Sequence, residues 1–233
     1  MWHWLMTPLS GATDHLIEPW AFWHARCMVL AWGILLPLGS FVARFYKVTP
    51  KQDWPRVLDN KLWWHGHRFL QCSGVFVMSV GLVLVLLRHA PGQSSSTFSA
   101  QLHALGGWSV IAFGWLQVLA AAFRGSSGGP AAAQLRGDHY DMTLRRRWFE
   151  RAHKKLGWVT LLAAAGVIAS GLYMVDAPRW MPLLLSAWYL LLAQQFWRLQ
   201  KAGRCVDTYQ AIWGPDTIHP GNRAYLTFCF DIS

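Results

Sequence analysis

Charged residues are scarce in this sequence. Asp, Glu, Lys and Arg make up only 14% of its 233 residues, well below the roughly 25% that is typical of soluble domains. Hydrophobic residues account for 54%, and the mean hydropathy is +0.22. This balance favours one integral membrane domain over two soluble ones. The net charge of +10 is concentrated in blocks between apolar runs, so it indicates membrane topology, and we expect no nucleic-acid partner.

Cysteine motifs are also missing. Of the four cysteines, Cys27 and Cys72 fall in apolar segments, and Cys205 and Cys229 fall near the C-terminus. Neither CxxC nor CxxCH occurs, so neither a zinc knuckle nor a covalently attached c-type haem is indicated. The stretch MWHWLMTPLSGATDHL has no cationic n-region and no long apolar h-region. It therefore does not predict a cleaved signal peptide.

Five apolar runs are each long enough to cross a hydrocarbon core about 30 Å thick, which takes roughly 17–25 helical residues. They are nearly free of charge, and Pro37 is expected to kink the first run, which a packed membrane helix tolerates. Tryptophans lie at the run ends, at the depth that indole prefers. We therefore expect an all-α integral membrane protein with five transmembrane helices. The runs are Cys27–Ala43, Phe69–Leu87, Ala104–Phe123, Leu156–Val175 and Met181–Trp197.

Lys and Arg are distributed very unevenly between the connections of these runs. All but Arg26, Arg88 and Arg179, that is 18 of the 21, fall on one side of the membrane if the runs alternate in direction. The positive-inside rule then places the N-terminus outside and the C-terminus in the cytoplasm, and we expect a bacterial inner membrane. The expected divisions are an outer segment at 1–18, a transmembrane domain at 19–201, and a cytoplasmic tail at 202–233.

Four of the ten histidines stand at equivalent places, close to the start of four consecutive runs, and the fifth run has none. Alternating helices put His24 and His103 at the outer level, and His67 and His153 at the inner level. In an up-and-down bundle each pair lies on diagonal helices and can clamp one haem iron between two imidazoles. A lone histidine at the start of a helix is usually an interfacial polar residue, but the joint pattern favours function. The sequence thus predicts two haem b groups in a four-helix bundle, with these histidines as metal ligands.

Residues near these histidines fit the same interpretation. Gly107 and Gly157 follow His103 and His153 by four residues, on the same helix face, where a flat macrocycle needs a surface without side chains. Contact between helices explains such glycines equally well. Arg26 and Arg68 are expected to bind the cofactor through its propionates. The other cations at a suitable depth are Arg151, Lys154 and Lys155.

The other histidines are given no role. His65 competes with His67, but residues two apart face about 200° away from each other, and His67 lies deeper. His89, beside Arg88, is interpreted as an interfacial residue. The histidines expected to face solvent are His3, His15, His139 and His219.

From Trp20 to Met174 the sequence resembles the two-haem, eukaryotic-type cytochrome b561 family. The resemblance implies the same ligand pairs that depth indicates, and it selects His67 over His65. The ascorbate-linked members have six helices, whereas five are expected here, as in versions joined to a DOMON domain. No DOMON domain is found in this sequence, and no ascorbate site is transferred. The stretches that carry the resemblance are HARCMVLAWGILLPLGSFVARF, WWHGHRFLQCSG, HALGGWSVIAFGWLQ and RAHKKLGW.

We predict transfer of single electrons across the membrane, between a donor on one face and an acceptor on the other. Two histidines per iron leave no open position, which favours outer-sphere transfer over oxygen binding. The sequence does not decide between ascorbate, quinone and a redox protein as the electron partner. A homodimer, and a ferric or monodehydroascorbate reductase activity, are also left open. The protein is expected to be surrounded by membrane lipid. One alternative is a haem-b membrane anchor subunit that exchanges electrons with quinone for a partner enzyme. Another is a haem-free transporter or proton path, for which the helix middles offer only Ser79, Gln117, Thr160 and Ser170.

Overall fold

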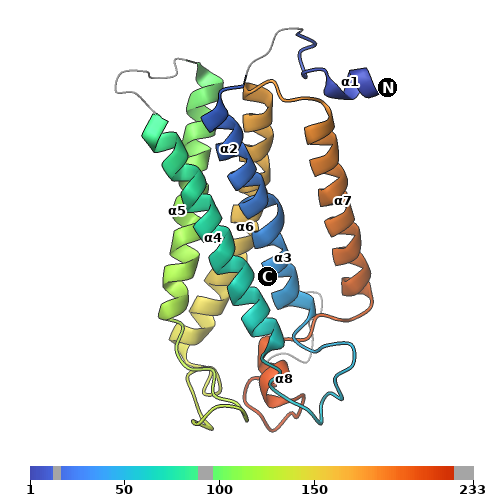
Figure 1. Cartoon of the computed structure of the whole chain (residues 1–233). Coiled ribbons are helices and arrows are strands. Elements are labelled where there is room, and N and C mark those ends of the chain that lie inside the picture. Colours follow the sequence, from blue (N-terminus) through green and yellow to red (C-terminus); the bar gives the residue numbers. More distant parts are fainter. Residues whose placement is uncertain (13–16, 89–96, 223–233) are drawn as a thin grey trace. The chain divides into compact units, whose positions relative to one another are not determined.

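The computed structural model describes residues 1–12, 17–88 and 97–222. Within these ranges the regular elements are helices (Figure 1), and bridged extended backbone is limited to one pairing of Pro8 with Pro178. The all-α prediction is confirmed. In chain order the elements are α1 (Trp2–Met6), α2 (Pro19–Met28), the π-helical η1 (Val29–Leu35), α3 (Leu36–Phe45), α4 (Leu62–Arg88), α5 (Phe98–Ala122), α6 (Leu144–Met174), α7 (Trp180–Lys201) and α8 (Thr208–Trp213).

The chain divides into two compact units, and the division falls within α3, α4, α5, α6 and α7. Unit 1 comprises Met1–Pro37, Gln71–Trp115 and Val159–Gln194. Unit 2 comprises Leu38–Leu70, Leu116–Trp158 and Gln195–Ser233. Each unit therefore contains part of every long helix.

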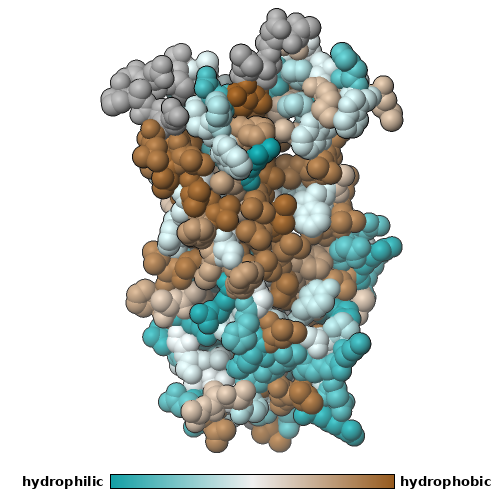
Figure 2. Space-filling model, viewed as in Figure 1, coloured by the Kyte–Doolittle hydropathy of each residue, from teal (hydrophilic) through white to brown (hydrophobic). Residues whose placement is uncertain are grey.

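Four of the described helices are long and apolar enough to cross a membrane, and they agree with the first four expected spans. They leave large apolar side chains exposed, as lipid-facing helices do; Phe76 and Leu87 of α4 are 70% and 77% exposed. Figure 2 shows apolar side chains gathered over the face that carries α4. The four helices are Pro19–Phe45, Leu62–Leu87, Phe98–Ala122 and Leu144–Met174.

The expected fifth span is not confirmed. A helix forms at that place, because α7 has 22 residues, about 33 Å of helix. Ser186, Gln194, Gln195 and Arg198 make its sequence less apolar than that of the other four, and it is not among the described helices that qualify by composition as well as length.

The first span changes its hydrogen-bond pattern midway, where α2 passes into η1 and then α3. Pro37 has no N–H and cannot donate to the carbonyl of Gly33, four residues earlier. That carbonyl instead accepts a hydrogen bond of 2.8 Å from the indole Nε1 of Trp188 on α7. The expected disturbance at Pro37 thus takes the form of a π-helical segment whose freed carbonyl is satisfied by a neighbouring helix.

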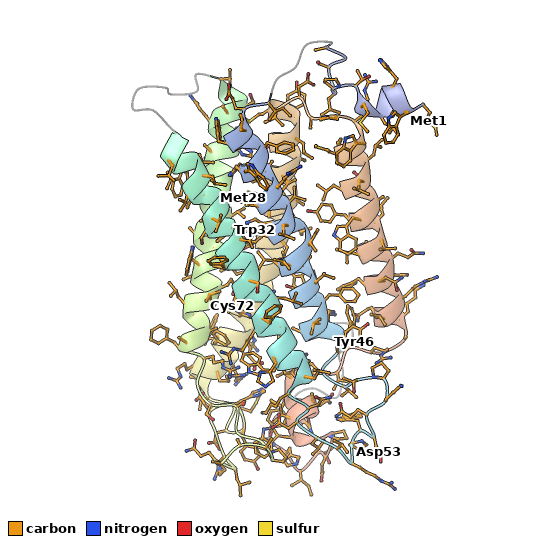
Figure 3. All side chains as sticks on the ribbon, in the orientation of Figure 1. Met1, Met28, Trp32, Tyr46, Asp53 and Cys72 are labelled. Atoms are coloured by element: carbon orange, nitrogen blue, oxygen red, sulfur yellow. The ribbon has the colours of Figure 1, made fainter. Side chains whose placement is uncertain are left out.

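Unit 1 packs around Trp32 and Met78, which are 5% and 0% exposed; Figure 3 labels Trp32 on its helix. A Cβ at Gly114 of α5 would lie 3.1 Å from Cζ2 of Trp32. The missing side chain therefore lets the indole lie directly against α5.

Unit 2 packs around Phe45, which is 1% exposed. Its ring lies 4.9 Å from that of Phe41 and 5.1 Å from that of Phe196, measured between centroids. Beside it, Nη2 of Arg44 donates a 2.8 Å hydrogen bond to Oε1 of Gln200. These contacts join α3 to the C-terminal part of α7.

The expectation that His139 faces solvent is wrong, because its side chain is buried, with 2% exposed. Its Nε2 lies 3.2 Å from Oε1 of Glu150 on α6, and its ring packs 5.3 Å from that of Tyr209 on α8. The polar stretch around His139 suggests solvent, but α8 covers it. His219 is also half-buried, and its ring lies 6.0 Å from that of Tyr140. Of the other residues with sequence-based expectations, His3 is exposed, and His15, His89, Arg223 and Cys229 lie outside the described residues.

Candidate metal centres

The first predicted histidine pair lies in unit 1. His24 of α2 and His103 of α5 face each other with 6.5 Å between ring centroids and 79° between ring planes. Nδ1 of His24 is 3.0 Å from the carbonyl oxygen of Gly81 on α4. A carbonyl can only accept, so in the neutral ring Nδ1 carries the proton and Nε2 keeps a free lone pair.

The tautomer of His103 follows from Ser170 of α6. The Ser170 hydroxyl donates its only proton to the carbonyl of Val167 at 2.8 Å. Towards Nδ1 of His103, 3.0 Å away, it can therefore only accept. His103 thus also carries its proton on Nδ1, and its Nε2 is free to bind a metal.

The second predicted pair lies in unit 2. The rings of His67 on α4 and His153 on α6 are 6.4 Å apart at 82°. Nδ1 of His67 lies 2.9 Å from the carbonyl of Gly39 on α3, which again leaves Nε2 free. The ring of Phe149 stacks on His153 at 5.2 Å, whereas the buried Nδ1 of His153 has no hydrogen-bond partner among the described residues.

Both pairs fit a metal held between two axial imidazoles. Metal–imidazole bonds of about 2 Å, with about 1 Å from ring nitrogen to ring centre, place two such centroids about 6 Å apart. Among the described residues there is no group of three or more His, Cys, Asp or Glu side chains that could hold a metal ion. Two protein ligands suit a haem, whose porphyrin brings the other four nitrogens. Metal-binding histidines also commonly donate their second nitrogen to a carbonyl or similar acceptor, as three of these four do.

Glycines near the pairs differ in what they face. A Cβ at Gly171 of α6 would lie 2.9 Å from Cε1 of His103, so this glycine makes room for the imidazole. A Cβ at Gly107 would meet nothing within 4 Å, whereas one at Gly157 would lie 3.3 Å from Nε2 of Gln117. Gly107 therefore borders open space, and Gly157 lies in a helix contact.

The predicted cations occupy different surroundings. The guanidinium carbon of Arg26 lies 3.8 Å from the ring centroid of Phe22, on its own helix. Lys154 Nζ is 3.8 Å from carboxylate oxygens of both Glu150 and Asp207. Arg151 and Lys155 are exposed. Arg68 lies beside Trp64, together with Arg124, which the sequence interpretation did not single out.

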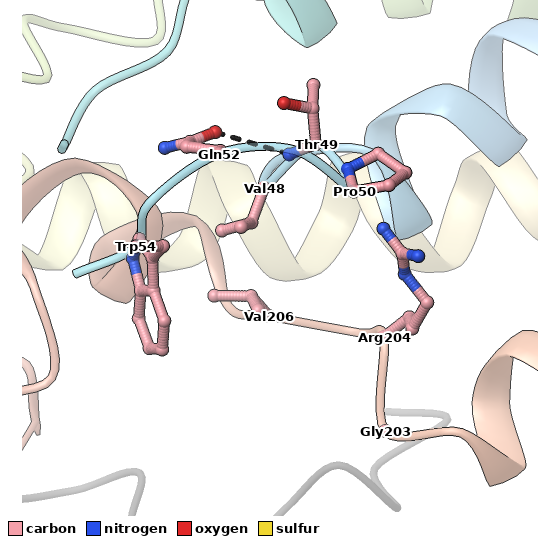
Figure 4. Close-up of a pocket in the computed structure, with 8 residues that line it drawn as sticks. All are labelled: Val48, Thr49, Pro50, Gln52, Trp54, Gly203, Arg204 and Val206. Atoms are coloured by element: carbon pink, nitrogen blue, oxygen red, sulfur yellow. Dashed lines mark hydrogen bonds between the residues drawn. The ribbon is translucent and has the colours of Figure 1, made fainter. Parts of the chain in front are cut away.

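A cavity of 270 Å³ opens in unit 2, between the connection that follows α3 and the chain beyond α7 (Figure 4). Val48 and Val206 give it an apolar lining, with Arg204 at one side. Oε1 of Gln52 accepts a 3.2 Å hydrogen bond from the Thr49 backbone N–H. None of the four candidate ligands lines this cavity, so it is separate from the histidine pairs.

Two Arabidopsis thaliana proteins are similar to this chain. It is 26% identical over 168 residues, 72% of its length, to one named "Cytochrome b561, DM13 and DOMON domain-containing protein". It is also 26% identical over 156 residues, 66% of its length, to one named "Cytochrome b561 and DOMON domain-containing protein". The chain is related to the cytochrome b561 family. The resemblance inferred from the sequence motifs is confirmed.

The similarity to the two cytochrome b561 relatives covers only a small part of each relative. The chain spans 16% of the length of the first relative and 28% of the second. No protein-family model matches it, and no solved structure matches it. Together with the four apolar helices, the relationship supports an integral membrane protein. Both relatives are plant proteins, so they give no support to the expected bacterial inner membrane.

Proposed function

We propose that this chain transfers single electrons across a membrane through two b-type haems, one in each unit. His24 and His103 hold one haem, and His67 and His153 hold the other. The observation that carries the proposal is the pair of facing imidazoles in each unit, 6.5 and 6.4 Å apart between centroids. The relationship to cytochrome b561 proteins supports it independently.

The chain's own residues have three tasks in this function. When bound, a haem supplies an iron that changes between its ferric and ferrous states. The two imidazoles of each pair would hold the haem iron between them and leave it no open position, which would favour electron transfer over oxygen binding. The carbonyls of Gly81 and Gly39 accept the Nδ1 protons of His24 and His67, which fixes the ring orientations and raises the basicity of Nε2. The surrounding apolar helices keep water away from the ligands.

A five-span topology belongs to the same proposal, with α7 as the fifth span. It places 18 of the 21 Lys and Arg residues on one side of the membrane. Four spans would move the cations of the C-terminal part to the opposite side, against the positive-inside rule. The relatives carry a DOMON domain in their names, so a redox protein domain is a candidate electron partner beside ascorbate and quinone.

The deciding experiment is a dithionite-reduced minus oxidised spectrum of the purified protein, with a pyridine haemochrome count. We expect two b haems per chain, falling to about one in either His24→Ala or His153→Ala. His65→Ala is the matched control, because His65 is exposed and adjacent to the second pair in sequence; it should keep both haems.

A colourless protein from haem-sufficient cells would overturn the proposal and favour the haem-free transporter. Haem together with a tightly bound partner enzyme that reacts with quinone would favour the membrane-anchor alternative.

A further inference from the structure

Two arginines of unit 2 gather around one indole. The guanidinium carbon of Arg124 lies 4.0 Å from the ring centroid of Trp64, and that of Arg68 lies 5.7 Å from it. Trp64 precedes His67 by one helical turn on α4, and their rings are 6.2 Å apart at 33°. Two permanent positive charges are therefore held next to a candidate axial ligand.

These two charges have no anionic partner among the described residues. The carboxylates that form ion pairs there engage other cations, and neither Arg68 nor Arg124 takes part in any of them. Glu150, the carboxylate that acts most favourably on Arg124, is already shared by Arg146 at 3.0 Å and His139 at 3.2 Å.

The surroundings of Arg124 make it energetically unfavourable for its guanidinium to lack an anionic partner. Burial, together with the like charges of Arg146 and Arg68, lowers the pKa of its guanidinium to about 10. An arginine in such a place normally has a carboxylate or phosphate opposite it. The face of Trp64 supplies a cation–π contact, but an indole has no oxygen to accept the guanidinium protons.

We propose that Arg68 and Arg124 form a carboxylate-binding site that receives a propionate of the haem held by His67 and His153. This inference rests on the proposed function and assigns Arg124 a binding role. Each haem b carries two propionates, and a guanidinium matches a carboxylate with two parallel hydrogen bonds. Trp64 holds the two guanidinium groups beside the ligand histidine, so that the site is arranged before the haem binds.

The other histidine pair has no such arrangement among the described side chains. The unit 1 arginines whose side chains the structure describes are Arg26 and Arg179. Arg26 lies over Phe22 and Trp23 of its own helix, and Arg179 lies over Trp4. The carboxylate site thus distinguishes the unit 2 haem from the unit 1 haem.

The test compares two porphyrins that differ only in their carboxylates. Full-length apoprotein carrying His103→Ala, which leaves only the unit 2 pair, is titrated with haem b or with its propionate dimethyl ester. We expect Arg124→Gln to weaken haem b binding about tenfold and to leave binding of the ester unchanged. Arg124→Lys keeps the charge but loses the bidentate geometry. Its affinity for haem b should lie between that of the unsubstituted arginine and that of Arg124→Gln.

Arg136→Gln is the matched control. It removes one positive charge from the same unit, but Arg136 is already paired with Asp141 and its side chain is 76% exposed; neither titration should change. The inference is overturned if Arg124→Gln weakens both porphyrins equally or neither. A protein with His103 intact that binds no haem at all would overturn the proposed function itself, which is a separate outcome.

Discussion

At the scale of single residues, the groups hydrogen-bonded to Nδ1 determine which nitrogen can reach a metal in three of the four candidate ligands, His24, His67 and His103. His24 and His67 use backbone carbonyls, which remain acceptors whatever side chain stands at that position. His103 instead depends on the hydroxyl of Ser170, a side chain that can be replaced. His103 is therefore the candidate ligand whose orientation can be perturbed by changing one other side chain.

Ser170→Ala should weaken the unit 1 site without removing a ligand. Losing the acceptor of a metal-bound histidine typically costs 10–100-fold in affinity, so we expect roughly tenfold weaker haem binding at the His24–His103 pair and no change at the other. Haem titration of the purified apoprotein measures this. Ser79→Ala is the matched control, since the Ser79 hydroxyl donates only to the Val75 carbonyl of its own helix. Equal effects of the two variants would contradict the role of Ser170.

At the scale of elements, the apolar runs predicted the four candidate spans well, because the composition of a membrane helix is a local property. The sequence could also pair the histidines by depth, since alternating helices fix which ends share a level. It could not identify Gly39, Gly81 or Gly171, because a backbone carbonyl or a missing side chain acquires its role only when another helix packs against it.

The burial of His139 has the same origin, because the Tyr209 that covers it lies 70 residues later in the sequence. Polar neighbours in the chain suggested an exposed loop, whereas the contact between that loop, α6 and α8 makes a buried one. A prediction from local polarity was therefore wrong for His139, because the residues that surround it come from elements distant in the sequence.

This packing between elements should make stability depend on pH. Burial lowers the pKa of His139; Glu150 partly offsets this effect, and Arg146 adds to it. A histidine whose folded pKa is lowered binds fewer protons than the unfolded chain below about pH 6.5, so stability is lost as the pH falls through that region. We expect the melting temperature of the detergent-purified protein to fall as the pH drops below about 6.5, and His139→Gln to lose part of that fall.

The control for His139 is His3→Gln, because His3 is exposed and should contribute nothing to the pH dependence. Identical pH profiles for the wild type and His139→Gln would show that His139 is not the titrating group.

At the scale of the whole molecule, the charge distribution and the apolarity of the helices point to different numbers of spans. Composition and length qualify four described helices, whereas the Lys and Arg distribution requires an odd number. The two criteria disagree only on α7, whose 22 residues are long enough but include several polar side chains. A helix of this kind can still span if its polar side chains face protein; one such contact is the hydrogen bond from Trp188 to the Gly33 carbonyl.

The side of the membrane on which the C-terminal part lies therefore decides the topology. Single cysteines introduced at Ser127, in the connection before α6, and at Asp216, after α8, should react with a membrane-impermeant maleimide from the same side in oriented vesicles. A cysteine at Gly11 should react only from the opposite side. In all of these variants the four native cysteines are replaced by Ser. Ser126→Cys, next to the first position, is a check, because it should react from the same side as the cysteine at Ser127. If the cysteine at position 216 instead reacts together with the one at position 11, α7 does not cross the membrane, because an even number of spans would return the chain to the side on which it began.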